Sequence, residues 1–562
     1  MTRIGRIIGQ PTPFTHPHLL PPGHLAIGQP ASLFADRRKR LFKLLSPGTL
    51  ALIPGYRFRY ASKNIFYPFR QCSNVHWLSG YGEPDGMLLL EKDQREQCKF
   101  VMFVPEITDF DMTWTGPRCD AAAAVEVFGA DEAHPLHQLP AYLKQARLSG
   151  RLGSPSAQRW LSQFDQNSTK MPIQGLGQAE ADLLFSDSLH QSGHQDAQRQ
   201  KLLSSPYASF LQEESNDHGY GHGMPGGKFS QIDMLLQYMR VFKDQHEISV
   251  MQRAADLAAA GFSAVEQLLL SNGHSVGNTA KFIRNTVDDQ KTNEQTSFCH
   301  SSDLGFNQND GLCEYHLAAA FQNACMSGGA DMLAYTPVVA SASNALVLHY
   351  IHNRSLLQQG QMVLMDAGAY FAGYNSDVTR TFAISNRQSN NGNGKTELIG
   401  QGIANVDSMK VSSSGLLGNQ TAMTQEQAEL YQAVLAVQTA CIAKCSEASR
   451  MSLNDLHVYS VGVMARELGK LGFPQDEQLI ESVLYPHSIG HYLGCDLHDC
   501  ELVSKDIPLK ANMVITVEPG VYVRADRRFP SRYHGIGIRI EDDVVIAAAG
   551  EEPLVLSRNI PK

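Results

Sequence analysis

Acidic residues and histidines recur in short segments of the carboxyl-terminal half of this chain. Asp366 and Asp377 lie in a run with the pattern of two strands around a turn near residues 371–373. If the loop is Phe371-Ala372, the two aspartates lie directly opposite each other, whereas a turn shifted by one residue leaves them diagonal. Like charges opposed across a strand pair are destabilising, so two buried aspartates there require a cation or a proton. If this hairpin is considered alone, the two aspartates could equally lie on a solvent-exposed face without a metal.

Two glutamates extend this set of carboxylates. Isoleucine occupies every second position of 536–540, so a strand there presents Arg539 and Glu541 together on the opposite face. Glu518 follows the apolar strand pattern of 513–517 and precedes a Pro-Gly turn. Acidic residues at strand ends are often exposed, so either glutamate alone is weak evidence for a site. The evidence comes from its combination with the other acidic residues.

Three histidines, His487, His491 and His498, lie in the segment PHSIGHYLGCDLHD. The first two have the spacing of a zincin helix, but Ser488 stands where that motif needs its glutamate, which excludes a simple zincin. The glycines of the segment disfavour a regular helix, and a loop can direct histidines inward. A hydrogen-bonded core position is the alternative for each histidine taken alone.

Together these segments offer four carboxylates and one imidazole as metal ligands. Such donors suit hard or borderline divalent ions, and Mn²⁺ fits better than a thiolate-seeking metal. Two ions are needed to share so many negative ligands. The candidate ligands are Asp366, Asp377, His491, Glu518 and Glu541.

A length of 562 residues predicts two domains. An extension at 1–35 precedes a mixed α/β domain at 36–230, which has short apolar runs at 50–53, 87–90 and 100–104 and ends in a flexible linker rich in Gly, Ser and His. The second domain is expected at 238–560, with polar insertions near 271–311 and 385–424.

Helices are predicted at three places in the second domain. Apolar residues recur at steps of three or four from Ile248 to Leu269, which gives one apolar face. Two further helices are expected over 424–446 and 452–471, the second ended by Gly472 and a following proline.

Composition narrows the class of protein. A formal charge of −9 argues against a nucleic-acid partner, and no run approaches the ~18 apolar residues of a membrane span. The 10 cysteines form no CxxC pair, which fits a reducing compartment. Arg3 and Arg6 without nearby acids give a charge bias seen in targeting segments, so the compartment stays open.

The motifs D-x10-D, H-x3-H-Y-L-G-x-D-x-H-D, V-E-P-G and R-I-E-D, in this order, resemble those of the aminopeptidase P and prolidase group. The resemblance implies an α/β (α+β) architecture with a carboxyl-terminal pita-bread domain, as in creatinase and methionine aminopeptidase. It also implies that Asp377 and Glu541 bridge two metal ions. Asp366 would complete the coordination of one ion, and His491 and Glu518 would complete that of the other.

The same resemblance assigns roles around the metals. Glu518 matches a proton-shuttling glutamate, and an activated water is the expected nucleophile. His349, His487 and His498 match substrate-pocket histidines that steady the carbonyl and the tetrahedral intermediate. Arg539 matches an arginine that orients a ligand carboxylate. Tyr522 is a further pocket candidate.

The amino-terminal half resembles aminopeptidase P rather than methionine aminopeptidase, through Tyr67-Pro-Phe-Arg-Gln71 and the run from Trp77 to Asp85. Asn64 stands where the family often has an aspartate that reaches a neighbouring subunit, so that contact is not carried over. The segments at 8–20 and 329–340 resemble the mitochondrial branch, which includes intermediate-cleaving and Xaa-Pro aminopeptidase 3-like enzymes.

These features imply a dinuclear metal aminopeptidase that removes the N-terminal residue of peptides or proteins. Its expected substrates are Xaa-Pro peptides or import intermediates trimmed in mitochondria, and a homodimer is one assembly that the resemblance allows. The alternatives are a cytosolic prolidase-like dipeptidase and a catalytically inactive pita-bread protein that only binds peptides.

Overall fold

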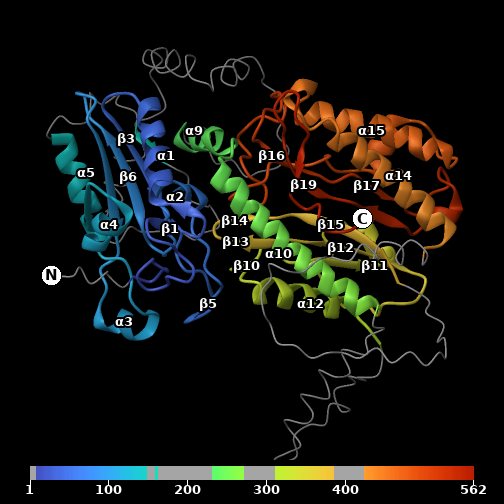
Figure 1. The fold of residues 1–562 in the computed structure, drawn as a ribbon, viewed down its shortest axis with the longest axis horizontal. Helices are drawn as coiled ribbons and strands as arrows, with labels where there is room; N and C mark the ends of the chain where they lie inside the picture. Colours follow the sequence, from blue (N-terminus) through green and yellow to red (C-terminus); the bar gives the residue numbers. More distant parts are fainter. Residues whose placement is uncertain (1–7, 149–158, 162–230, 271–310, 385–422) are drawn as a thin grey trace, which may run out of the picture. The chain divides into compact units, whose positions relative to one another are not determined.

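The computed structural model describes residues 8–148, 159–161, 231–270, 311–384 and 423–562. It divides into two compact units (Figure 1). The predicted linker and most of both predicted insertions lie outside the described residues. None of the helices in the described ranges has the length and hydropathy needed to cross a membrane. The first unit comprises Met1–Val250, Ala372–Tyr374 and Gly494–Ile507, and the second comprises Met251–Phe371, Asn375–Leu493 and Pro508–Lys562.

The first unit is built on a five-stranded sheet with the order β8-β7-β6-β3-β9. The three apolar runs of the sequence form its antiparallel centre, which confirms the predicted strands. The two outer strands pair in parallel with their neighbours. The strands are β3 (Thr49–Pro54), β6 (Met87–Lys92), β7 (Cys98–Val104), β8 (Glu132–Pro135) and β9 (Arg159–Leu161).

Helices cover both faces of this sheet, which explains why its central strands are apolar on both sides. Alternate residues such as Leu89 and Phe103 pack against α5 (Leu139–Leu148). On the opposite face the Arg38 guanidinium of α1 (Ala31–Leu44) lies 4.2 Å from the centre of the Phe100 ring. Further elements of this unit are α2 (Ser73–Ser79), α3 (Asp109–Thr115), α4 (Ala121–Phe128), and the short strands β1 (His24–Ala26), β2 (Gln29–Pro30), β4 (Tyr60–Ser62) and β5 (Ile65–Phe66).

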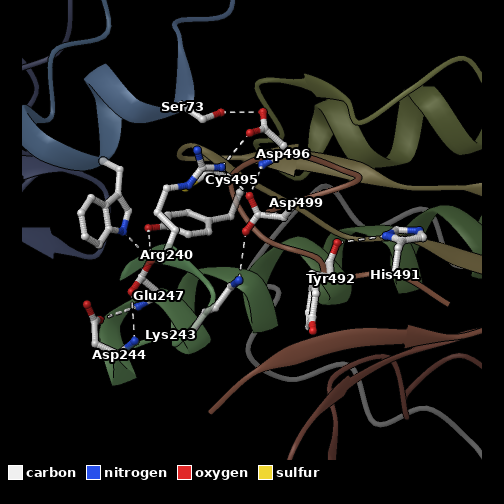
Figure 2. Close-up of polar contacts among 12 residues, drawn as sticks. Ser73, Arg240, Lys243, Asp244, Glu247, His491, Tyr492, Cys495, Asp496 and Asp499 are labelled. Carbon is white, nitrogen blue, oxygen red and sulfur yellow. Dashed lines mark hydrogen bonds and ion pairs between the residues drawn. The ribbon is translucent and has the colours of Figure 1, made fainter. Parts of the chain in front are cut away.

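Buried ion pairs tie the segment Gly494–Ile507 to the rest of the first unit (Figure 2). Asp499 accepts hydrogen bonds from Arg240, at the end of α9 (Gln231–Arg240), and from Lys243 at 3.0 Å. Asp496 pairs with Arg240 at 2.7 Å and accepts from Ser73 at 2.6 Å. Asp499 is buried together with both cations, so removal of one partner from these pairs would leave a buried charge uncompensated.

The second unit contains the strands that carry the candidate ligands. Its main sheets have the orders β11-β12-β15 and β16-β19-β20, and β17 pairs with β18. The strands are β11 (Val338–Ser341), β12 (Met362–Ala367), β15 (Val378–Ala383), β16 (Val514–Val517), β17 (Gly520–Tyr522), β18 (Gly537–Arg539), β19 (Asp542–Val545) and β20 (Leu554–Val555). A short strand β10 (Met332–Leu333) pairs with β13 (Ala369–Phe371).

Long helices pack on these strands (Figure 1). Phe262 of α10 (Gln245–Leu270) contacts Phe321 of α12 (Glu314–Ser327) and Phe382 of β15. The two later helices, α14 (Gln425–Ile442) and α15 (Leu453–Lys470), pack against each other, and α14 contacts β16, β17 and β18. All three predicted helices are therefore confirmed.

Helices α14 and α15 begin at capping boxes. The Thr424 side chain accepts from the Gln427 amide, and the Ser452 side chain accepts from the Asp455 amide. Each cap satisfies backbone donors that the first turn leaves free, so it fixes where the helix starts.

The 362–382 hairpin takes the second of the two registers that the sequence left open. The chain reverses at Ala372-Gly373, both with positive φ, between β13 and β14 (Tyr374–Asn375). Asp366 therefore pairs with Thr379, and Asp377 lies diagonal to Asp366. The shifted turn was the alternative arrangement, and it still keeps both aspartates on one face.

Candidate metal centre

Three of the five predicted ligands come together most closely in the second unit. One donor atom each of Asp377, His491 and Glu541 lies within 4.8 Å of the others. Asp377 lies just before β15 and Glu541 just before β19, so both side chains project from strand ends. Asp377 and Glu541 are buried. This group is the centre of the site.

His491 is oriented by the backbone around it. Its Nδ1 lies 3.0 Å from the Tyr492 carbonyl (Figure 2), which leaves Nε2 3.2 Å from Oδ2 of Asp377. Burial alone would lower the pKa of His491, but the hydrogen bond and charge of Asp377 raise it. A carbonyl on one ring nitrogen and ligands around the other is the arrangement of a metal-binding histidine.

The loop that carries His491 runs beside β16. The Thr516 amide donates to the His491 carbonyl at 2.9 Å, and the Glu518 amide donates to Ile489 at 2.8 Å. A Cβ at Gly490 would lie only 2.0 Å from the Thr516 carbonyl oxygen. Glycine is thus required for this close approach, and the prediction of a loop rather than a helix is confirmed.

Asp366 is linked to the central group by a tyrosine that sequence reasoning did not identify. The Tyr335 hydroxyl contacts Oδ1 of Asp366 and lies 2.5 Å from Oδ1 of Asp377. Arg539 donates from Nη2 to Oδ2 of Asp366 at 2.6 Å. Burial, followed by the like charge of Asp377, raises the pKa of Asp366 despite the arginine. Arg539 therefore fixes the orientation of the Asp366 carboxylate.

Glu541 is held by Thr379, the residue opposite Asp366 in the sheet. The Thr379 hydroxyl donates to Oε2 of Glu541 at 2.6 Å and accepts from Nε of Arg539 at 3.0 Å. Burial raises the pKa of Glu541 well above its ordinary value, and the charges of Asp377 and Glu518 add to the effect. An anion in this position calls for a compensating cation.

Glu518 lies at the edge of the group, directly after β16. Its Oε1 is 3.9 Å from Nε2 of His491 and accepts from the Thr516 hydroxyl at 3.4 Å. Burial raises the pKa of Glu518 to about 7, although the charges of His491 and Arg539 oppose the rise. A carboxyl group in this range can both accept and release a proton near neutral pH.

The three predicted pocket histidines differ in placement. His487 lies 3.8 Å from Glu518, and its Nε2 is 2.9 Å from the Tyr522 hydroxyl. Burial, followed by the charge of Arg539, lowers the pKa of His487 to about 3, so its ring is neutral. His349 is exposed on the loop after β11. His498 is exposed in the segment Gly494–Ile507 of the first unit, so it is not among the residues that the second unit brings together.

Sequence reasoning missed Tyr335, Thr379 and Asp543, whose carboxylate lies 3.2 Å from the Asp377 amide. Strand alternation could have identified Thr379, which shares a face with Asp377. Tyr522 proved to be a central contact, because its hydroxyl accepts from Nη1 of Arg539 at 2.8 Å.

The donor set fits divalent metal ions. Burial raises the pKa of Asp366, Glu518 and Glu541, which means that their charged forms are disfavoured without a cation. Carboxylate oxygens with one imidazole suit hard or borderline ions rather than thiolate-seeking ones.

Known proteins resemble this chain over nearly its whole length. Residues 34–151 match the aminopeptidase P N-terminal domain, and residues 249–396 and 410–548 match metallopeptidase family M24. Xaa-Pro aminopeptidase 3 of Rattus norvegicus is 30% identical over 99% of this chain and 89% of its own length. Mitochondrial intermediate cleaving peptidase 55 of Arabidopsis thaliana is 30% identical over 100% of this chain and 87% of its own length.

A solved structure agrees with both matches. The crystal structure of Icp55 from Saccharomyces cerevisiae, lacking its N-terminal 58 residues, has a TM-score of 0.64 and 26% identity over 96% of this chain and 97% of that one. The predicted pita-bread architecture with an aminopeptidase P N-terminal domain is thereby confirmed. The chain belongs to metallopeptidase family M24, as a metal-dependent aminopeptidase of the aminopeptidase P type.

Proposed function

We propose that the site holds two Mn²⁺ ions. Asp377 and Glu541 would bridge them. Asp366 would complete the coordination of one ion, and His491 and Glu518 would complete that of the other. The observation that carries this proposal is the mutual approach of the donors of Asp377, His491 and Glu541. The Tyr335 hydroxyl, which reaches both Asp366 and Asp377, supports a place for Asp366 in the same centre.

Two divalent ions in such a centre supply an activated water and polarise the scissile carbonyl. Glu518 would take up the proton that attack on the carbonyl releases and pass it to the leaving amine. Neutral His487 would line the substrate pocket beside the scissile carbonyl, with its Nδ1 donating to the Ser488 carbonyl and its Nε2 accepting from the Tyr522 hydroxyl. His349 and His498 would contact the peptide from their loops. Arg539 would hold Asp366 in a fixed orientation while charge redistributes.

The substrate that we propose is the N-terminus of a peptide or protein. It is either a peptide that begins Xaa-Pro or a protein that is trimmed after its import into mitochondria. Similarity over nearly the full chain to Xaa-Pro aminopeptidase 3 and to a mitochondrial intermediate cleaving peptidase supports both readings and a mitochondrial location.

The proposed substrates can be distinguished from those of a prolidase by assaying purified protein with three peptides. One begins Xaa-Pro, one begins with Tyr followed by a residue other than proline, and one is an Xaa-Pro dipeptide. Cleavage of the longer peptides at least as fast as the dipeptide is expected. A strong preference for the dipeptide would indicate a prolidase-like enzyme instead. A comparison of mitochondrial protein N-termini with and without the enzyme then identifies its natural substrates.

A further inference from the structure

Glu314 is a buried carboxylate outside the candidate metal centre. It is the first residue of α12, its exposed fraction is 0%, and it accepts five hydrogen bonds from neutral donors. Oε1 accepts from the Ser341 amide at 2.8 Å, the Ser341 hydroxyl at 2.7 Å and Asn344 at 3.0 Å. Oε2 accepts from the Tyr350 hydroxyl at 2.9 Å and the Ser355 amide at 2.8 Å. A buried carboxylate is stable only while its hydrogen bonds are made, so these five donors are held close to Glu314.

Ser341 is the last residue of β11, and the other donors lie in the loop that follows it. Residues 342–356, here named the His349 loop, leave the sheet at the end of β11 and return beside the start of α12. The Glu314 amide donates to the Ser355 carbonyl at 3.0 Å, and the Leu357 amide donates to Leu312 at 2.8 Å. One carboxylate therefore joins the entry of the loop to its exit.

The middle of the His349 loop alternates between inward and outward side chains. Leu348 and Tyr350 pack against the apolar cluster that contains Tyr522. Val347 and Ile351 are 54% and 55% exposed, and His349 between them is exposed as well. Since Glu314 binds Tyr350 on the inner side, the neighbouring His349 is directed outward.

The loop shares its support with the metal centre. Its packing partner Tyr522 contacts His487 at 2.9 Å and Arg539 at 2.8 Å, and Arg539 in turn binds Asp366. The strand that leads into the loop starts at Val338, which pairs with Asp366. The loop and the ligands are thus parts of one framework within the second unit.

We propose that Glu314 is a positioning residue of the peptidase reaction, which fixes His349 for contact with the peptide by clamping both ends of its loop. The inference rests on the proposed function, in which His349 touches the substrate. Burial alone would raise the pKa of Glu314, but the hydrogen bonds of Ser341, Asn344 and Ser355 lower it below its ordinary value. The clamp therefore acts as a carboxylate, which binds neutral donors more strongly than an amide does.

Two variants test the clamp. Glu314→Gln keeps the shape of the side chain but turns an NH₂ group towards N–H or O–H donors that need an acceptor. Tyr350→Phe removes one donor, leaves the buried charge in place, and carries the test if Glu314→Gln does not fold. Glu551→Gln, an exposed site in the same unit, is the matched control. Each is combined with His349→Ala, and metal content, kcat and KM are measured on a cleaved peptide.

With full metal content, Glu314→Gln is expected to lower kcat/KM about tenfold or more, and Tyr350→Phe less. On the His349→Ala background neither variant should lower kcat/KM further, because the group being positioned is gone. Losses that multiply with that of His349→Ala, or an unchanged kcat/KM, would overturn the inference. A metal-loaded wild-type protein that cleaves none of the peptides would instead overturn the proposed function.

Discussion

Oδ2 of Asp377 and Nε2 of His491 lie 3.2 Å apart, with a carboxylate oxygen of Glu541 close to both. At this distance a proton on the imidazole can hold the pair together, and a divalent ion can replace that proton. These two side chains can therefore share either a proton or an ion.

Asp377→Ala is expected to abolish metal binding and lower kcat/KM by more than about a hundredfold, because it removes the proposed bridging ligand. Mass spectrometry of bound metal and peptide cleavage measure the two losses. Glu552→Ala, at an exposed site of the same unit, should change neither. Near-normal turnover with full metal content would contradict the bridging role.

Thr379→Val tests the support of Glu541. The variant keeps the side-chain shape but removes the hydroxyl that donates to Glu541 and accepts from Arg539. Metal affinity should fall about tenfold to a hundredfold, as for other residues that orient ligands. Thr379→Ser restores the hydroxyl and should recover most of the affinity. Equal affinity of all three proteins in a metal titration would show that this hydrogen bond has no part in binding.

His498→Ala is expected to lower kcat about a hundredfold without loss of metal, since this residue is proposed to stabilise the substrate carbonyl rather than to bind an ion. His246→Ala, another exposed histidine of the first unit, is the control. If metal content falls together with kcat in His498→Ala, the residue belongs with the ligands instead.

Much of this centre was predictable because its residues follow strand periodicity. Arg539 and Glu541 were placed on one face by the alternating isoleucines, and both now contact the site. The sequence left the turn position open because Ala372 adopts φ +48, which alanine rarely does, and the usual Asn-Gly signal of a two-residue hairpin is absent. Tyr335 and Glu314 could not be found in this way, since each acts through contacts with residues distant in the sequence.

His76 predicts a pH dependence of stability in the first unit. Burial, followed by the charge of Arg37, lowers the pKa of His76 to about 4. The unfolded chain therefore binds the extra proton first, so stability is complete above about pH 6.5 and falls as the pH drops towards 4, by about 3 kcal/mol. Denaturant unfolding across this range should show a steeper loss for wild type than for His76→Phe. Parallel curves for the two proteins would rule out this linkage.

Metal titration with activity read in parallel tests the dinuclear centre most directly. Protein is stripped by a chelator, dialysed and titrated with Mn²⁺, while release of the N-terminal residue from Xaa-Pro-initiated and Tyr-initiated peptides is followed. Two equivalents of ion per chain are predicted, with no cleavage before metal is added and full cleavage once both sites are filled. Cleavage by the stripped protein, or full cleavage with only one equivalent of ion bound per chain, would contradict the proposed dinuclear centre.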